Sequence, residues 1–164
     1  MAERLVAADA SPLIGLAAAG EFDLLRRLFG QLTITNTVRD EVLAGADLPG
    51  AAELAAAIRD GWIQVEHTPA ATGAFADLDA GESSTLTLAA AHVGPSLILM
   101  DEPLGRSYAD AHGLAVTGLA GVLLAAKRAS LVTSVRPLFE RLAARDFRLS
   151  DQLVQAILEQ AGET

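Results

Sequence analysis

The fold of this chain is decided by the run Leu5-Val6-Ala7-Ala8-Asp9, in which four apolar residues end at an acid. A second run of the same kind, Ser96-Leu97-Ile98-Leu99-Met100, ends at the acidic pair Asp101-Glu102. Short, continuous apolar runs are typical of strands that are buried on both faces of a parallel sheet. A helix-start signal follows each run, because Pro12 and Pro103 suit the first turn of a helix. Both acids are therefore expected where a buried strand gives way to a helix.

Asp9 and Asp101 would then lie at the edge of the sheet where ligands bind. In open α/β sheets that edge is the one outside the carboxyl ends of the strands, at the point where the strand order reverses. Carboxylate oxygens are the ligands that Mg²⁺ and Mn²⁺ prefer. The two acids therefore predict a metal site, in which a bound ion could activate water and stabilise charge on a phosphodiester.

The rest of the chain alternates between strand and helix patterns. Further strands are predicted at residues 31–35, 62–65 and 114–117. Helices are predicted at residues 12–18, 21–29, 37–44, 50–60, 79–93, 103–112, 118–129, 134–144 and 150–160, with Asn36 as the N-cap of the third and a loop at 67–78. This alternation indicates parallel βαβ units, an α/β fold with helices on both faces of one sheet. No segment has the composition of a linker, so we expect a single domain over residues 1–164.

The composition bounds the function. The net charge is −9, which argues against a general nucleic-acid coat but allows a nuclease whose acids gather at one metal site. The absence of cysteine excludes disulfides and thiolate chemistry and fits a cytoplasmic protein. The first residues lack the layout of a signal peptide. The apolar stretch 115–126 is far shorter than the roughly 20 residues that span a bilayer, so we expect no membrane segment.

Three more acids join the candidates, and each has a structural alternative. Glu41 lies on a predicted helix, where a solvated acid is an equal interpretation. Glu82 follows Asp79 with the spacing of a capping box, which makes a structural role its strongest rival. Glu102 could cap the helix that follows it. Asp9 itself could be a polar strand end, although aspartate is depleted in strands.

Ser11 could cap its helix or reach a metal-bound water through its hydroxyl. Other catalytic classes fit less well: His67, His92 and His112 lack the spacing of metal ligands. No Gly-x-Ser-x-Gly elbow and no phosphate-binding glycine-rich loop is present. A phosphoryl-aspartate enzyme would typically carry a second aspartate at position 11.

Several of these segments resemble one known family. The run from Leu5 to Ile14, followed by Asp23-Leu24-Leu25, resembles the opening of PIN-domain proteins, the fold of VapC-type toxin ribonucleases. The later segments resemble one prokaryotic branch of that family; they are Leu78–Glu82, Asp101-Glu102, Arg106, Gly113-Leu114, Val116–Gly118 and Gly121–Arg128. The resemblance runs from about Leu5 to Leu149 and depends on the order and spacing of these segments.

The resemblance implies a PIN-like three-layer α/β/α sandwich with a central parallel sheet, whose first and fourth strands are neighbours. It implies that Asp9, Glu41, Glu82 and Asp101 form an acidic quartet that holds one or two Mg²⁺ or Mn²⁺ ions for RNA hydrolysis. Arg106 matches a basic position that could meet a phosphate. The chain departs from the branch at Asp101–Leu104, where a second aspartate and two basic residues are usual.

We therefore expect a metal-dependent endoribonuclease, the toxin of a toxin–antitoxin pair, with RNA as substrate and an antitoxin protein as partner. Asp9 and Asp101 would be the main metal ligands, Glu41 and Glu82 would complete the site, and Glu102 could add a further ligand. Ser11 and Arg106 would meet the substrate. Two alternatives stay open: a catalytically silent PIN-like module that binds a partner protein, and a metal-dependent phosphohydrolase with a substrate other than RNA.

The last predicted helix, 150–160, carries an apolar stripe. Leu153, Val154, Ile157 and Leu158 lie on one face of it. Such a stripe either packs on its own domain or meets another chain. We expect a homodimer.

Overall fold

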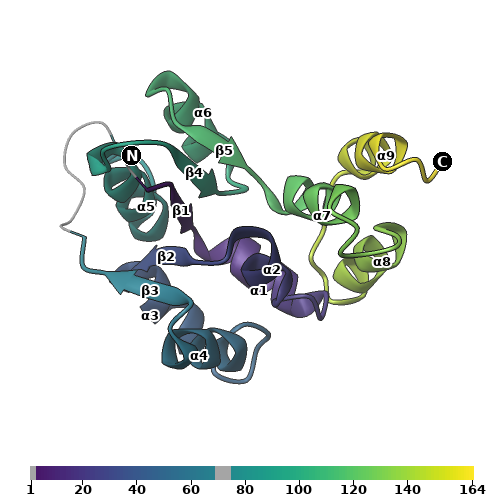
Figure 1. The fold of residues 1–164 in the computed structure, drawn as a ribbon, viewed down its shortest axis with the longest axis horizontal. Coiled ribbons are helices and arrows are strands. Elements are labelled where there is room, and N and C mark those ends of the chain that lie inside the picture. Colours follow the sequence, from purple (N-terminus) through teal and green to yellow (C-terminus); the bar gives the residue numbers. More distant parts are fainter. Residues whose placement is uncertain (1–2, 69–74) are drawn as a thin grey trace.

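A single parallel sheet organises the structure. The computed structural model describes residues 3–68 and 75–164, and in them five parallel strands lie in the order β3-β2-β1-β4-β5 (Figure 1). The strands are β1 (Leu5–Ala8), β2 (Leu32–Thr35), β3 (Ile63–Glu66), β4 (Ser96–Leu99) and β5 (Ala115–Thr117). Each lies within or beside the segment in which the sequence predicted it. The predicted α/β class is confirmed.

Helices connect and flank the strands. They are α1 (Ala10–Ala18), α2 (Leu24–Phe29), α3 (Asn36–Ala44), α4 (Ala51–Asp60), α5 (Ala80–Ala91), α6 (Pro103–Ala111), α7 (Leu119–Arg128), α8 (Arg136–Ala144) and α9 (Asp151–Gln160). The predicted helices are present with shifted ends: α1 begins at Ala10 rather than Pro12, and α2 begins at Leu24 rather than Glu21. Residues 69–74 of the predicted loop lie outside the described residues.

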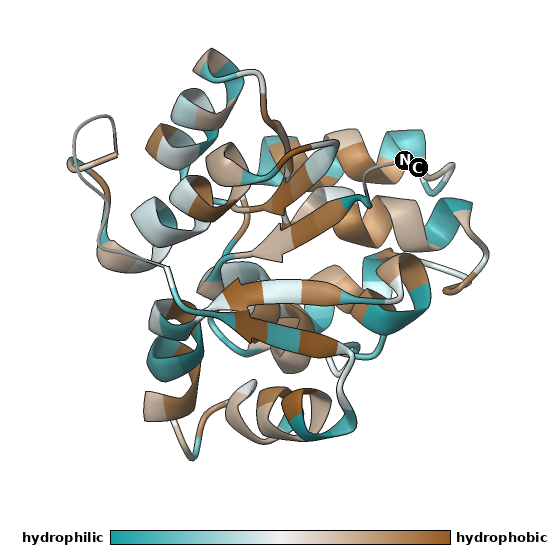
Figure 2. Ribbon diagram, turned by 60° about the vertical axis from the view of Figure 1, so that its left-hand side comes forward, coloured by the Kyte–Doolittle hydropathy of each residue, from teal (hydrophilic) through white to brown (hydrophobic). Residues whose placement is uncertain are grey.

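The sheet separates two apolar clusters, which makes the fold a three-layer α/β/α sandwich (Figure 2). Ile98 and Met100 belong to the cluster formed with α5 and α6, whereas Leu97 and Leu99 belong to the larger one, formed with α1, α2 and α7. This alternation follows from the two-residue period of a strand. Each fully buried leucine contributes about 1.5–3 kcal/mol of transfer free energy. An aliphatic core is therefore sufficient here, despite few aromatic residues.

The strand order reverses between β1 and β4. Strand β1 pairs with β2 on one side and with β4 on the other, with Ala8 opposite Leu99. The first and fourth strands are thus neighbours, as the sequence resemblance implied. The chain turns one way from β1 to β2 and β3, and the other way from β4 to β5. The carboxyl ends of β1 and β4 consequently form the crevice in which such sheets bind ligands.

Two predicted helix caps are wrong by one or two positions. Thr35, with an extended backbone, caps α3 because its hydroxyl accepts a hydrogen bond from the Val38 N–H at 3.1 Å. Asn36 is instead the first residue of that helix, and its side chain accepts from the Thr68 N–H at 3.3 Å. In α1 the N-cap position belongs to Asp9, not to Ser11.

The C-terminal helices α8 and α9 lie beyond α7 (Figure 1). Most of the apolar stripe of α9 packs on its own chain: Ile157 and Leu158 are buried in the large cluster and Val154 is half-buried against it. Leu153 stays 41% exposed. Among residues 3–68 and 75–164, none of the helices has the length and apolar character that crossing a membrane requires.

Candidate active site

Asp9 and Asp101 lie just beyond the carboxyl ends of two neighbouring strands. The Asp9 N–H continues the ladder between β1 and β4 by donating to the Leu99 carbonyl at 2.9 Å. Asp9 occupies the N-cap position of α1 with an extended backbone, yet its side chain makes no capping hydrogen bond. The residue is only 5% exposed. Its carboxylate is thus buried at the sheet edge without a role in capping the helix that follows.

Gly81, in the first turn of α5, is the point at which three carboxylates converge. A Cβ atom on this glycine would lie 2.8 Å from Oε2 of Glu41, 3.2 Å from Oδ1 of Asp9 and 3.6 Å from Oδ1 of Asp79. The three acids come from α3, the end of β1 and the N-cap of α5, which are far apart in the sequence. The missing side chain of Gly81 leaves the space in which the carboxylates of Asp9 and Glu41 stand close together.

Glu82 takes part in the capping box that its spacing predicted. The Glu82 N–H donates to Oδ1 of Asp79 at 2.8 Å, and the Asp79 N–H donates to Oε2 of Glu82 at 3.3 Å. Glu82 is also 9% exposed and belongs electrostatically to the same acidic group, because the charges of Asp79 and Asp9 act on it. The capping and site interpretations of Glu82 are therefore compatible.

The environment of these acids favours their protonated forms. Burial, and then the negative charges of Asp79, Glu41 and Asp101, raise the pKa of Asp9 from 3.8 to about 7, against an opposing hydrogen bond from the Ala10 N–H. Partial desolvation and the charge of Asp79 raise the pKa of Glu41. Burial and the contact with Asp79 raise the pKa of Glu82. Such like-charge crowding is typical of sites that hold a cation or move protons.

Asp101 is oriented by two helices. Its Oδ1 accepts a hydrogen bond at 2.8 Å from the N–H of Leu119, the first residue of α7. A Cβ on Gly118 would stand 2.5 Å from this oxygen and 3.0 Å from Nη1 of Arg106, so the guanidinium lies beside the carboxylate. Burial raises the pKa of Asp101, while the Leu119 N–H and the Arg106 charge oppose the shift. Within the described residues, Oδ2 of Asp101 is buried without a hydrogen-bond partner.

The other predicted residues lie around this edge with different contacts. Oε2 of Glu102 accepts from the Gly105 N–H at 2.6 Å, so Glu102 caps α6. Arg106 donates from Nη1 to the Met100 carbonyl at 3.2 Å, which helps to hold its guanidinium near Asp101. Ser11 is exposed in the first turn of α1.

Sequence reasoning missed Asp79 as a member of the acidic group. Its capping-box spacing gave it a complete local explanation, so its charge was not counted. The signal available was Gly81, since a glycine inside a helix costs about 1 kcal/mol relative to alanine and indicates a steric reason for its presence.

The comparison with known families agrees with this geometry. Residues 5–163 match the family model described as a PIN domain. The chain belongs to the PIN-domain family. Neither a curated protein nor a solved structure matches it. PIN domains are generally nucleases and typically use divalent metal ions.

The acids of this PIN domain fit a divalent cation by their donor chemistry. Within residues 3–68 and 75–164, no three acidic or histidine side chains stand close enough together to hold an ion between them. Mg²⁺, however, usually keeps several waters and binds protein through only one or two carboxylates. The unpartnered Oδ2 of Asp101 and the oxygens around Gly81 could supply such ligands. That the predicted acids hold one ion together stays a prediction.

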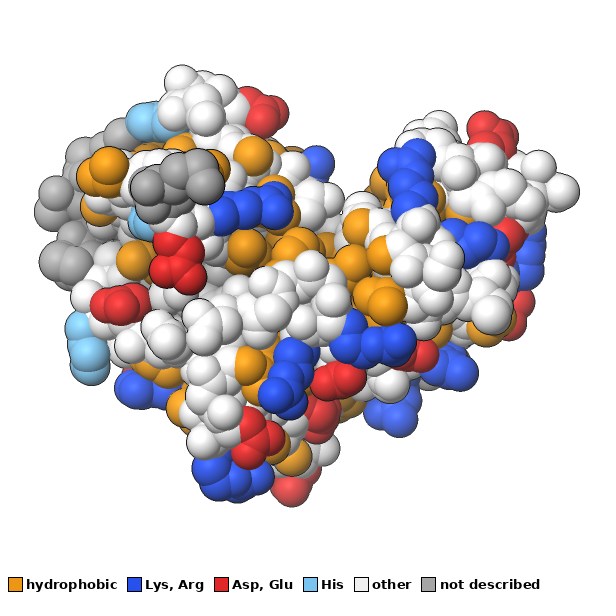
Figure 3. Space-filling model, in the orientation of Figure 1, with side chains coloured by type: hydrophobic (Ala, Val, Ile, Leu, Met, Phe, Trp, Pro, Cys, Tyr) orange, Lys and Arg blue, Asp and Glu red, His pale blue; other side chains and the backbone are white. Residues whose placement is uncertain are grey.

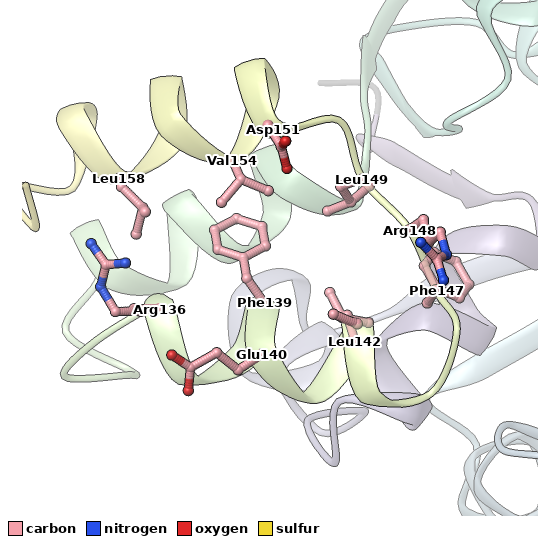
Figure 4. Close-up of a pocket in the computed structure, with 11 residues that line it drawn as sticks. Arg136, Phe139, Glu140, Leu142, Phe147, Arg148, Leu149, Asp151, Val154 and Leu158 are labelled. Carbon is pink, nitrogen blue, oxygen red and sulfur yellow. The ribbon is translucent and has the colours of Figure 1, made fainter.

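The PIN domain has a groove beside Asp101. It lies between α6 and α9, holds about 590 Å³, and is visible as the hollow between the two parts of the molecule in Figure 3. Asp101 and Arg106 both line it. A separate hollow of about 320 Å³ between α8 and α9 is lined mainly by apolar side chains such as Phe139 and Val154 (Figure 4). None of the predicted site residues lines this second hollow, whereas Asp101 and Arg106 line the α6–α9 groove.

Proposed function

We propose that this PIN domain, acting as a single domain over residues 1–164, is a divalent-metal-dependent endoribonuclease that hydrolyses phosphodiester bonds. The observation that carries the proposal is that two groups of acidic side chains lie at one edge of the sheet. One is the carboxylate group around Gly81, and the other is Asp101 with an unpartnered oxygen beside an arginine. An oxygen-only donor set next to a cation suits a metal ion facing a phosphate.

The roles of the side chains follow from their contacts. Asp101, held through Oδ1 by the Leu119 N–H, would present Oδ2 to Mg²⁺ or Mn²⁺. Asp9 and Glu41, whose carboxylates lie close to Gly81, would supply further oxygen ligands, and Glu82, in the first turn of α5, would complete the site. When bound, the ion would neutralise these charges and favour the attack of water on phosphorus.

Arg106 and Ser11 are the proposed substrate contacts. Arg106 lines the groove and lies beside Asp101, which suits contact with a phosphate next to the scissile one. Ser11 is exposed two residues after Asp9, so its hydroxyl is accessible from solvent. Glu102 is already engaged with the Gly105 N–H, and we propose it as a cap rather than a main ligand.

The test is cleavage by purified protein, freed of any partner, of one structured and one single-stranded RNA. We expect cleavage that requires Mg²⁺ or Mn²⁺, stops with EDTA and leaves a 5′-phosphate on the downstream fragment. Asp9→Asn keeps the size of the side chain and removes its charge, so it should abolish turnover without unfolding the protein. Equal cleavage by the parent and by Asp9→Asn would identify a contaminant.

We further propose that the enzyme is the VapC-like toxin of a toxin–antitoxin pair, and that an antitoxin protein binds it. A homodimer remains a separate proposal, which light scattering at tens of micromolar tests.

One observation favours the alternative of a silent partner-binding module. Leu104 is 46% exposed next to Pro103. Basic residues are usual at these positions in the prokaryotic branch of the family that this chain resembles. An exposed leucine beside the site suits a protein surface better than a polyanion. Binding of Mn²⁺ without cleavage of any RNA would favour this module over the nuclease.

A further inference from the structure

The groove between α6 and α9 is built from segments that are far apart in the sequence. One wall comes from α6, the floor comes from the end of β5 and the start of α7, and the far wall comes from α9 (Figure 3). The lining residues that matter here are Asp101, Arg106, Gly118, Gly121, Leu153 and Ile157. Its volume of about 590 Å³ lies within the range of about 300–1,000 Å³ that is usual for sites holding one small ligand.

The charge of the groove limits what can occupy it. Among the described residues that line it, Arg106 is the one cation, and Asp101 and Asp110 are acids. Proteins that follow a nucleic-acid backbone use several cations, one for each phosphate that they neutralise. A single arginine can meet a single phosphate. The groove therefore suits one nucleotide of a chain better than a duplex or a long backbone tract.

The far wall is apolar and accessible. Leu153 is 41% exposed and lines the groove together with Ile157. The floor opposite is formed by Thr117, Gly118, Ala120 and Gly121, whose side chains are small or absent. This floor of small residues lies beside the aliphatic wall and leaves room for a planar, weakly polar group. Aromatic stacking residues do not line the groove among the described residues.

The wall is fixed in place at several points. Ser150 caps α9 by accepting from the Leu153 N–H at 3.1 Å, and Leu158 is buried in the large cluster. Beyond the helix, the Glu163 carboxylate accepts from the Val135 N–H at 2.8 Å and pairs with Lys127 at 3.2 Å. Leu153 thus projects into the groove from a rigid helix rather than from a loose tail.

We propose that α9 is the substrate-selecting wall of the enzyme: one unpaired nucleotide enters the α6–α9 groove, its base packs on Leu153 and Ile157, and its phosphate points toward Arg106. The proposal rests on the proposed nuclease function and adds to it a specificity-determining element. Recognition is then mostly apolar, with one ionic contact. Selection among bases depends on a helix that contributes none of the acids at the site.

The experiment measures binding and cleavage separately. Fluorescence anisotropy with the Asp9→Asn protein and four short homo-oligoribonucleotides, in Mg²⁺, reports binding without turnover. In that background, Leu153→Ala should weaken binding about three- to tenfold and reduce the differences between the four bases. Leu153→Phe should tighten binding by adding a stacking surface. Leu48→Ala truncates another exposed leucine, which does not line the groove, and should change nothing.

Salt dependence separates a base contact from a phosphate contact. Leu153→Ala should keep the slope of log affinity against log salt, whereas Arg106→Ala should reduce that slope by about one. A merely structural effect of Leu153 would instead appear as a lowered melting temperature relative to Leu48→Ala.

Each outcome decides the proposal. If the parent cleaves RNA and Leu153→Ala binds and cleaves as Leu48→Ala does, the α9 wall is refuted while the nuclease stands. If no RNA is cleaved but binding depends on Leu153 as described, the wall stands and the nuclease fails. If the Asp9→Asn protein binds none of the oligonucleotides, the wall is refuted as well.

Discussion

At the scale of single residues, Gly81 tests the candidate site most directly. A methyl group there would meet Glu41 at 2.8 Å and Asp9 at 3.2 Å. Glu41 is an exposed side chain and can move away, and alanine is favoured over glycine in a helix by about 1 kcal/mol. Gly81→Ala should therefore keep or raise the melting temperature, yet lose most RNA cleavage and the stabilisation by Mn²⁺. Thermal melts with and without Mn²⁺, beside a cleavage assay, measure both effects.

The control for Gly81 is a double-variant cycle with Glu41→Gln. If the added methyl group acts by displacing the Glu41 carboxylate, the two changes together should cost little more than either one alone. Fully additive losses would mean that Gly81 serves another purpose.

Substitutions at the neighbours Asp101 and Glu102 should distinguish a residue of the site from a helix cap. Asn at position 101 can still accept from the Leu119 N–H, so Asp101→Asn should fold normally and lose activity. Glu102→Ala removes the acceptor for the Gly105 N–H and should cost about 1 kcal/mol of stability while activity remains. Urea denaturation and cleavage rates distinguish the two variants. A Glu102→Ala protein that is stable but inactive would make Glu102 a ligand instead.

For helices and strands, the sequence predicted the structure correctly where a single local rule decides it. Continuous apolar runs predicted β1 and β4, and the acids that follow them lie at the strand ends. The predicted N-cap of α3 was wrong because Thr35 and Asn36 are both good capping residues. Thr35 has the extended backbone of a cap because it is the last residue of β2. Asp79 was missed because its proximity to Glu41 depends on how α5 packs against α3.

The contacts that join α7, α8 and the C-terminal tail were likewise unpredictable, because Glu163 is distant in the sequence from the residues that it contacts. Its carboxylate accepts hydrogen bonds from Ser134 and from the Val135 and Arg136 N–H groups, and it pairs with Lys127. Partial burial opposes ionisation, but these four donors prevail and lower the pKa of Glu163 to about 2.

Glu163→Gln should therefore destabilise the protein by about 1–3 kcal/mol, because it leaves donors at the start of α8 without an anionic acceptor. Since the folded pKa is lowered, this contribution is present above the ordinary value of 4.5 and is lost as pH falls toward about 2. Urea denaturation of the parent and the variant should converge in that acidic range. A constant difference down to pH ~2 would contradict the assignment.

At the scale of the whole molecule, the acidic edge should make stability depend on pH in the opposite sense and in a different range. The pKa of Asp9 is raised from 3.8 to about 7, and those of Glu41, Glu82 and Asp101 are raised as well. The folded protein therefore holds protons that the unfolded chain releases. The stability that these protons confer is complete below the unfolded pKa and is lost as pH rises toward 7.

Metal-free protein should accordingly melt at lower temperature as pH rises from about 4 to about 7, a range in which Glu163 is ionised in the folded state. Mn²⁺ should reverse the loss at the upper end, because a ligand at a hundredfold excess over its dissociation constant adds about 2.7 kcal/mol. The double variant Asp9→Asn/Asp101→Asn removes two of the crowded charges, so its melting temperature should vary less with pH and should not respond to Mn²⁺. An equal Mn²⁺ response in the parent and the double variant would place the metal elsewhere.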